Sequence, residues 1–355
     1  MIVLYILCVL LLLGLVLLLL LPFPKTVKVE IDNNPLVSII VAARNEEANI
    51  RACIESLLNQ NYPHIQLIVG DDDSTDRTSA ILKELQEEHS NLEVYSQFEK
   101  LEGLNGKANV LAQIDQYAKG EYLLFTDADT VANPDWTRVM LSSFDKNVGI
   151  VTGMTVPKTT LFQGIDWVYA LIQVIKMSAL GIPTTSMGNN MGVLSEAYQK
   201  VGGYTAVTNT LTEDYSLFHK IIEATYDYRF VFQKESLLMT KPVKGLLTLL
   251  YQRKRWMTGA TQLPFIIIAI LLLLAAFYPI IIFILINNLE VGIAIWVVKI
   301  LLQSLIITTS YRRLSLSVHP LRLLFYEFYS LLLTGGVMLF YALPIKVKWK
   351  GRTYD

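Results

Sequence analysis

Continuous apolar runs about as long as a membrane span occur at both ends of the chain. They cover Ile2–Leu21, Pro264–Ile286, Val291–Ser310 and roughly Leu323–Leu343. An apolar helix of about 20 residues is long enough to cross the hydrocarbon core of a bilayer. We therefore expect one N-terminal membrane anchor and about three C-terminal membrane segments.

The sequence between these runs has the pattern of a water-soluble α/β domain. Short, continuous apolar stretches of strand length alternate with amphipathic stretches of helical period. Buried strands connected by helices predict a mostly parallel sheet with helices on both faces. The expected strands are Leu36–Ala43, Ile65–Gly70, Asn91–Gln97 and Glu121–Thr126, and the expected helices are Arg44–Gln60, Thr78–His89 and Lys107–Lys119.

These patterns divide the chain into three expected parts. Residues 1–21 form the anchor, and residues 22–263 form the α/β domain, which ends in an amphipathic helix at the membrane interface. Residues 264–355 form a membrane domain of about three hydrophobic segments with a short basic tail. In open parallel sheets, ligands bind at the carboxyl ends of the strands, so acidic residues at those ends are candidate binding residues.

Composition and charge favour an integral membrane protein with its domain in the cytosol. The chain is 53% hydrophobic and only 17% charged. The first apolar run has neither a basic start nor a small-residue cleavage site, so we interpret it as an anchor and not a signal peptide. Lys25 and Lys28 follow it, and the positive-inside tendency then places the domain on the cytosolic side of the plasma (inner) membrane.

The two cysteines and the net charge indicate the compartment and the kind of partner. Cys8 lies in the anchor and Cys53 in the domain, so they cannot pair, which fits a reducing compartment. The net charge is −1, and no basic cluster is followed by interleaved aromatic residues. We therefore expect no nucleic-acid partner.

Asp127 and Asp129 follow directly on the apolar strand at Tyr122–Phe125. Two carboxylates at positions i and i+2 of a strand end point to the same side and repel each other. A hard divalent cation makes such a pair favourable, and its natural co-ligand is a diphosphate. The pair therefore predicts a site for a hard divalent cation and a diphosphate ligand.

Two further acidic groups lie at the boundaries of expected elements. One is Gly70–Asp76, directly after a strand, where Asp, Ser and Thr are also ordinary turn formers. The other is Glu213 with Asp214 at an expected helix start, where acidic residues also interact well with the helix dipole. Either group alone permits a structural or a functional interpretation.

A basic and aromatic segment, Tyr251–Gly259, precedes the second apolar run. A juxtamembrane basic belt with an interfacial tryptophan would explain its composition. Its spacing indicates more, because Gln252, Arg255 and Trp256 at i, i+3 and i+4 share one face of a helix.

Isolated polar residues interrupt three other apolar segments. Asp166 lies on a polar stripe of an otherwise apolar helix, which packs either against the membrane or in the domain core. Lys299 and Glu327 lie inside expected membrane segments, where ionisable residues are functional candidates. For Glu327 we expect that the side chain reaches the interface.

In order and spacing, these motifs resemble the membrane-integrated branch of glycosyltransferase family 2. The similarity covers about Pro35–Trp256 and includes the membrane segments at both ends. Its motifs are PLVSIIVAARNEEANI, LLNQNYPHIQLIVGDDDSTDRT, GLNGKANVL, LLFTDADT, TED and QRKRW. The family usually has a glycine where this chain has Asp73, which leaves open whether Asp71 or Asp72 faces the base.

The resemblance implies a GT-A fold, which is a nucleotide-sugar-binding α/β domain with a mostly parallel sheet, here flanked by transmembrane helices. It implies an inverting, metal-dependent transfer of a hexose from a nucleotide-diphosphate sugar, with a UDP-sugar as the expected donor. The expected donor-binding residues are Ala43, Arg44, Glu46, Asp71, Asp72, Lys107, Asp127, Gln252, Arg253, Arg255 and Trp256. The expected metal is Mg²⁺ or Mn²⁺, with Asp129 as its ligand and Asp127 on the metal or the ribose.

The resemblance also assigns the catalytic group and the acceptor region. Asp214, with Glu213 beside it, is the expected general base that takes the proton of the acceptor hydroxyl. Retention would need a second well-placed carboxylate, and the family speaks against it. The segment Gly188–Tyr204 matches the acceptor-pocket region, where glycines let the backbone approach a sugar closely.

Two kinds of acceptor are compatible with these motifs. QRKRW is the form often seen in processive polysaccharide synthases, which extrude a β-linked polymer. The small number of apolar segments, and a tail KVKWKGRTY that is similar to the tail of ceramide glucosyltransferases, favour a membrane lipid as acceptor. A silent scaffold or transporter is disfavoured, because the acidic positions are intact.

The expected topology conflicts with the charges of the tail. One crossing before the domain and three after it would place Lys346, Lys348, Lys350 and Arg352 outside, against the positive-inside tendency. We therefore expect one C-terminal segment to be interfacial or re-entrant, with the basic tail near the active site.

Overall fold

The computed structural model describes residues 1–25, 34–158, 162–178, 180–208, 210, 212–260, 263, 265–349 and 352–354. For 260, 266, 347–349 and 352–354 it describes the backbone alone. Lys28, Pro264 and Lys350, which the sequence analysis named, lie outside the described residues.

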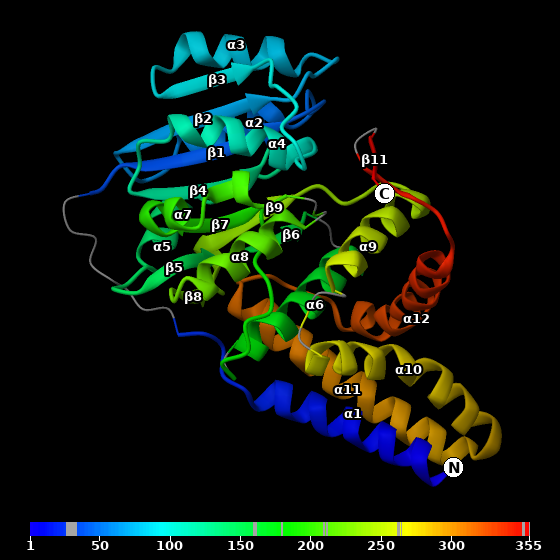
Figure 1. Ribbon diagram of the computed structural model, residues 1–355. Helices are drawn as coiled ribbons and strands as arrows, with labels where there is room; N and C mark the ends of the chain where they lie inside the picture. Colours follow the sequence, from blue (N-terminus) through cyan, green and yellow to red (C-terminus); the bar gives the residue numbers. More distant parts are fainter. Residues whose placement is uncertain are drawn as a thin grey trace.

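A seven-stranded sheet forms the centre of the domain, in the order β3-β2-β1-β4-β7-β5-β8 (Figure 1). Its first four strands in chain order confirm the predicted ones to within a residue or two at each end. These four strands pair with one another in parallel, as do β5 and β8, whereas β7 runs antiparallel to both β4 and β5. The strands are β1 (Val37–Ala43), β2 (Ile65–Asp71), β3 (Leu92–Ser96), β4 (Tyr122–Asp127), β5 (Val148–Thr152), β7 (Asn190–Leu194) and β8 (Asp227–Phe230).

Helices cover both faces of this sheet, which is why its central strands are apolar throughout. Two separate clusters of buried side chains pack against the sheet, one built on Val37, Ile39 and Val41 and the other on Ile40 and Ile68. The helices of the domain are α2 (Ile50–Leu58), α3 (Thr78–Glu88), α4 (Gly106–Ile114), α5 (Trp136–Leu141), α7 (Ser195–Lys200) and α8 (Glu213–Glu223), with 3₁₀ turns at Asp115–Tyr117, Gly203–Ala206 and Lys234–Ser236.

Two predicted helices are shorter than their periodicity suggested. The helix expected from Arg44 begins only at Ile50, because the chain first turns at Asn45, whose φ is +52°. That turn is tied to the loop after β2 by hydrogen bonds such as the one from the Asn45 amide to Ser74. The helix expected to reach Lys119 ends at Ile114 and continues as a 3₁₀ turn.

A second, smaller unit connects the sheet with the membrane helices. Strands β6 (Met154–Pro157) and β9 (Leu237–Thr240) pair in parallel, and the long helix α6 (Phe162–Ser178) follows β6. Helix α9 (Leu246–Ala260), which carries the QRKRW segment, follows β9. Both helices lie between the sheet and the apolar end of the molecule (Figure 1).

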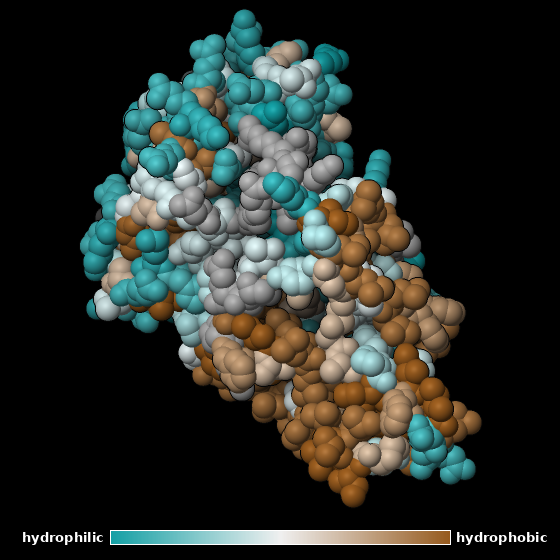
Figure 2. All heavy atoms as spheres, turned by 45° about the vertical axis from the view of Figure 1, so that its right-hand side comes forward, coloured by the Kyte–Doolittle hydropathy of each residue, from teal (hydrophilic) through white to brown (hydrophobic). Residues whose placement is uncertain are grey.

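Within the described part of the chain, four helices are long and apolar enough to cross a membrane. They are α1 (Ile2–Leu20), α10 (Phe265–Asn287), α11 (Leu289–Arg313) and α12 (Pro320–Ala342). The hydrophobic surface gathers at the end of the molecule that they form, whereas the opposite end is hydrophilic (Figure 2). A short hairpin of β10 (Val347–Trp349) and β11 (Arg352–Tyr354) ends the chain, with β10 beside α9.

Helix α1 is attached to the domain by more than its covalent link. Lys176, a buried residue of α6, donates hydrogen bonds to the carbonyls of Leu18 (2.8 Å) and Leu19 (3.4 Å). A cation at the C-terminal end of a helix interacts favourably with its dipole. The Lys176 amine also lies 4.4 Å from the centre of the Phe23 ring.

The expectation that Glu327 reaches the membrane interface is wrong. Its side chain is fully buried between α11 and α12 and forms an ion pair with Lys299. Trp296 and Gln303 donate hydrogen bonds to the same carboxylate, at 2.9 and 3.2 Å. A buried charge is stable only when it is paired and hydrogen-bonded in this way.

Candidate active site

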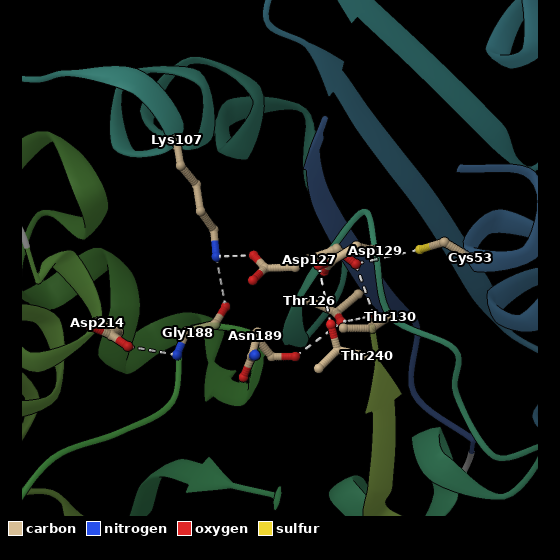
Figure 3. A network of polar contacts seen from close by, with 10 residues as sticks. All are labelled: Cys53, Lys107, Thr126, Asp127, Asp129, Thr130, Gly188, Asn189, Asp214 and Thr240. Carbon is tan, nitrogen blue, oxygen red and sulfur yellow. Dashed lines mark hydrogen bonds and ion pairs between the residues drawn. The ribbon is translucent and has the colours of Figure 1, made fainter. Parts of the chain in front are cut away.

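The paired aspartates lie where β4 ends, at the carboxyl edge of the sheet (Figure 3). Asp127 and Asp129 are half-buried, while Ala128 between them is buried. The Asp129 carboxylate accepts a hydrogen bond of 3.1 Å from the Thr240 hydroxyl, at the end of β9. The hydroxyls of Thr126 and Thr130 lie 2.7 Å apart and brace the turn between them.

Lys107, at the start of α4, points toward this turn (Figure 3). Its amine lies 2.5 Å from the Asp127 carboxylate and donates a 3.0 Å hydrogen bond to the carbonyl of Gly188. Burial alone would lower the pKa of Lys107, but Asp127 and Glu213 outweigh burial and raise it. The lysine is therefore a fixed positive charge among carboxylates.

Asp214, in the first turn of α8, lies on the other side of Gly188. One carboxylate oxygen accepts a 2.8 Å hydrogen bond from the Gly188 amide, and the other accepts one of 2.9 Å from the Tyr215 amide. A carboxylate has roughly four lone-pair positions, so two such bonds orient the group and leave capacity for an acceptor hydroxyl.

The absence of a side chain at Gly188 permits this close approach. A Cβ atom there would lie 2.9 Å from the Cβ of Asp214 and 3.3 Å from its Oδ2. The backbone groups of Gly188 therefore connect Lys107, which lies beside Asp127, with Asp214 in the first turn of α8 (Figure 3).

Glu213 lies next to the proposed base and is electrostatically coupled to helix α9. Burial and the neighbouring Asp214 raise the pKa of Glu213, whereas Lys107 and Arg255 act in the opposite direction. The Arg255 guanidinium thus brings positive charge to the same edge of the sheet.

The ends of β1 and β2 come together as the family pattern requires. Ala43 and Asp71 are register partners, and the Asp72 amide donates a 2.8 Å hydrogen bond to the Ala43 carbonyl. Arg44 donates a 2.5 Å hydrogen bond to the Asp72 carbonyl, and its guanidinium lies 3.7 Å from the Asp72 carboxylate. Glu46 is buried and accepts a 2.5 Å hydrogen bond from the Asn49 side chain.

The loop after β2 explains the departure from the family pattern at Asp73. Its φ is +51°, in the left-handed region that glycine adopts readily and that aspartate tolerates. The Asp71 carboxylate is used inside this loop, where it accepts hydrogen bonds from the Ser74 amide and the Ser79 hydroxyl. The Asp72 carboxylate lies beside Arg44 instead.

In helix α9, the QRKRW residues take different roles. Arg253 is buried and forms a 2.5 Å ion pair with Asp166 of α6. Its guanidinium also lies 4.2 Å from the centre of the Trp256 ring, which in turn packs edge-on against Trp167 at 5.0 Å. Arg253 thus positions Trp256, whereas Arg255 faces the acidic residues of the site.

Two other residues of α9 fix the helix in place. Gly259 lies so close to Thr212, the residue before α8, that a Cβ atom would approach its Cγ2 to 2.6 Å. Lys254 is buried and donates hydrogen bonds to carbonyls at the end of α12. Gln252 is also buried. Helix α9 therefore contacts both the residue that precedes α8, the helix that carries Asp214, and the end of α12.

The aspartate pair fits a Mg²⁺ or Mn²⁺ ion whose coordination shell is completed by substrate. Within the described ranges, no three His, Cys, Asp or Glu side chains gather as a metal-binding group. Mg²⁺ is usually held by one or two carboxylates together with substrate phosphates and water. With Asp127 beside Lys107, Asp129 is the carboxylate best suited to the metal, and its contact with Thr240 orients it.

Sequence reasoning missed three residues that organise the site. Thr240 holds Asp129 from a strand more than a hundred residues away, and nothing in the sequence signals this contact. Gly188 was noted for its small size, but not as the link between Lys107 and Asp214. Asp166 was recognisable as a lone acid on an apolar helix, although its partner Arg253 was not.

Taken together, the sheet, the aspartate pair and the acidic helix start have the arrangement expected of an α/β domain of the GT-A type. The sequence pattern of glycosyl transferase family 2 matches residues 38–185, and that of glycosyl transferase family group 2 matches residues 122–345. The chain therefore belongs to glycosyl transferase family group 2, which confirms the resemblance seen in its motifs.

The chain is also similar to individual proteins, at 29% identity to each of two curated relatives. It is 29% identical to the β-monoglucosyldiacylglycerol synthase of a Nostoc species over 252 residues, which are 67% of this chain and 52% of that protein. It is also 29% identical to the poly-β-1,6-N-acetyl-D-glucosamine synthase of Staphylococcus epidermidis over 254 residues, which are 68% and 59% of the two proteins. The chain thus spans between half and three fifths of these relatives.

Among solved structures, a mannosyltransferase from Pyrobaculum calidifontis in complex with GDP-Man and Mn²⁺ shares the fold. Its TM-score is 0.61 at 18% identity, and the match covers 95% of this chain and 94% of that one. The GT-A fold expected from the resemblance is thereby confirmed.

Proposed function

We propose that the protein is an inverting, metal-dependent hexosyltransferase that transfers a sugar from a nucleotide-diphosphate donor to a membrane lipid. The convergence of Asp127, Lys107 and Asp214 around the peptide of Gly188 carries this proposal. It supports the proposal because a positive charge suited to a diphosphate and a candidate base lie together at one edge of the sheet, where open α/β sheets bind their ligands.

In this proposal the donor lies across the ends of β1, β2 and β4. Arg44 and Asp72, with Ala43, Glu46 and Asp71 behind them, face the nucleoside. Asp129, with or without Asp127, would hold Mg²⁺ or Mn²⁺, which supplies charge stabilisation for the leaving diphosphate. Lys107 and Arg255 add positive charge from the protein.

Asp214 is the proposed general base. The amides of Gly188 and Tyr215 hold its carboxylate in one orientation. The carboxylate takes the proton of the acceptor hydroxyl as the oxygen attacks the anomeric carbon, and the nucleoside diphosphate leaves from the opposite face. One base is sufficient for this displacement, which inverts the configuration.

We further propose that the domain lies at the cytosolic face of the plasma (inner) membrane. Lys25 follows the anchor, and Arg312 and Arg313 end α11, whereas the uncharged Asn287, the last residue of α10, and Asn288 lie where α10 turns into α11. This distribution fits the positive-inside tendency if the domain is cytosolic. Residues 1–21, 22–263 and 264–355 stay the proposed anchor, catalytic domain and membrane domain.

A processive polysaccharide synthase is the second candidate, because one of the two relatives above is named as a polymer synthase. Membranes containing the full chain and fed a labelled UDP-sugar distinguish the two. A single adduct soluble in chloroform supports a lipid acceptor, whereas a ladder of high mass supports a polymer. GDP-mannose is tested in parallel, since the P. calidifontis enzyme was solved with it.

Carboxylate-to-amide variants on one helix test the mechanism. Asp214→Asn should abolish transfer, and Glu223→Gln at the exposed far end of α8 is the matched control. Asp129→Ala and chelator should each weaken donor binding. The proposal would be refuted if Asp214→Asn kept full transfer activity. It would also be refuted if neither Asp129→Ala nor chelator weakened donor binding.

A further inference from the structure

Helices α10 and α11 form a hairpin that brings the chain back to the catalytic domain. Asn288 alone separates the end of α10 from the start of α11, so the two helices run antiparallel. Helix α11 then contacts α6 on its way back to the domain (Figure 1). After Arg313 the chain is therefore on the side of the membrane from which α10 started.

The other end of α12 lies against α9. Lys254 donates hydrogen bonds to the carbonyls of Leu343 (2.7 Å) and Phe340 (3.3 Å). The Tyr251 ring packs edge-on against Phe340 at 5.1 Å. Since Arg253, the neighbour of Lys254, is ion-paired with Asp166 of α6, this part of α9 belongs to the domain side.

The length of α12 makes these contacts incompatible with a crossing. Its 23 residues extend over about 34 Å, enough for a bilayer core of about 30 Å. A crossing would carry Leu343 to the far surface, at a distance that a lysine side chain cannot bridge. The chain thus enters and leaves the α12 region on the same side.

We propose that α12 makes no net crossing and instead forms a membrane-contact surface that binds the leaflet next to the active site. One face of the helix is buried against the protein, through Leu323, Tyr326, Glu327 and Phe340. The opposite face presents an exposed apolar stripe with helical spacing, which consists of Leu321, Leu324, Phe325, Phe328, Leu332 and Leu339.

The occupant of this stripe is the lipid leaflet. Leu332 and Leu339 are 75% and 73% exposed, and water is a poor solvent for such a stripe. Arg313 and Arg322 lie at one end of the helix and Lys346 at the other, which suits anionic lipid headgroups. The stripe also belongs to the end of the molecule where the hydrophobic surface gathers (Figure 2).

This arrangement reduces the crossings to α1, α10 and α11. The basic tail then stays on the side of the catalytic domain, in agreement with the positive-inside tendency. It also assigns the interfacial or re-entrant segment expected from the sequence to α12. The inference rests on the proposed membrane tethering, but not on the proposed reaction.

Single cysteines on the full chain in membrane vesicles test the topology. Ser317→Cys and Ala342→Cys flank α12, and Asn287→Cys, at the α10 end of the hairpin, is the matched control; all three positions are exposed. The unaltered chain is the blank, because Cys8 and Cys53 are buried. We expect a membrane-impermeant maleimide to label 317 and 342 from one face and 287 from the other.

Labelling of 342 and 287 from the same face would overturn the proposal. A C-terminal epitope tag decides the case if position 342 does not react. Protease should remove the tag only from the face that labels 317, and removal from the face that labels 287 overturns the proposal. Neither measurement depends on sugar transfer, so a failed topology is distinguishable from a failed assignment of function.

Discussion

Gly188→Ala tests whether the peptide of Gly188 positions the catalytic base. The φ of Gly188 does not lie in the left-handed region, so alanine is compatible with its backbone. The added Cβ would, however, lie 2.9 Å from the Cβ of Asp214. The atom it meets is next to the main chain and cannot rotate away as the end of a long side chain would.

The expected displacement follows from these distances. Ordinary van der Waals contact begins at 3.4 Å, so the two Cβ atoms must separate by 3.4 − 2.9, about 0.5 Å. A misplacement of about 1 Å in an active site costs about a hundredfold in rate. We therefore expect the turnover number to fall about ten- to a hundredfold.

The assay separates the base from the donor site. Initial rates of transfer from a labelled donor are measured with the purified full chain, and donor affinity is measured by calorimetry without acceptor. Donor affinity should change little, because the substitution keeps the Gly188 carbonyl that accepts from Lys107. Gly14→Ala in α1, where no atom lies within 4 Å of the new Cβ, is the control.

An unchanged turnover number in Gly188→Ala would refute this reasoning. It would mean either that Asp214 tolerates the shift or that another group removes the proton. Asp214→Asn distinguishes these two cases, since an essential base cannot be replaced by an amide.

Three further predictions test other parts of the structure. Lys107→Met should weaken UDP binding about ten- to a hundredfold, as expected for loss of a charged hydrogen bond. The affinity for uridine, which lacks the diphosphate, should not change when it is measured by the same calorimetry. Equal losses of affinity for both ligands would contradict the assignment of Lys107 to the diphosphate. Asp166→Asn and Arg253→Met should each lower the free energy of unfolding by about 3 kcal/mol, because each leaves a buried charge unpaired. In thermal unfolding, the double variant should lose much less stability than the sum of the two single losses. Additive losses would exclude a stabilising interaction between the two side chains. Burial raises the pKa of Asp115 to about 6, so Asp115 of the unfolded chain loses its proton at lower pH than in the folded protein. The free energy of unfolding of the wild type should therefore fall by up to about 3 kcal/mol as the pH rises from about 4 to about 6. Asp115→Asn should remove this pH dependence, and parallel profiles of unfolding free energy against pH for the two proteins would contradict the prediction.

The strands and the motif positions were predictable because their signals are local. The apolar run Leu123–Phe125 indicates a buried strand on its own, and the aspartates that follow must then lie at its carboxyl end. The parallel order of β1, β2 and β4 follows from the alternation with helices. The edge of the sheet that binds ligand was therefore accessible from the sequence.

Contacts between distant segments were not predictable in this way. Arg44 has the periodicity of a helix start, but hydrogen bonds between the Asn45–Glu47 turn and the loop after β2 hold it outside the helix. Arg253 donates a hydrogen bond to a carboxylate 87 residues earlier in the chain, a partner that its own segment does not indicate. In both cases a tertiary partner, absent from the local pattern, decides the conformation.

Helix α6 shows how the membrane helices and the candidate base are mechanically connected. Near its start, Asp166 accepts hydrogen bonds from Arg253 of α9 and Tyr326 of α12. Near its end, Lys176 holds the last carbonyls of α1. The chain continues from α6 to Gly188, whose amide donates a hydrogen bond to Asp214. The helix that precedes the candidate base's partner is thus fixed near its start to α12 and near its end to α1. In the proposed function, an acceptor that arrives from the leaflet would therefore reach Asp214 beside a helix that is tied to the membrane helices.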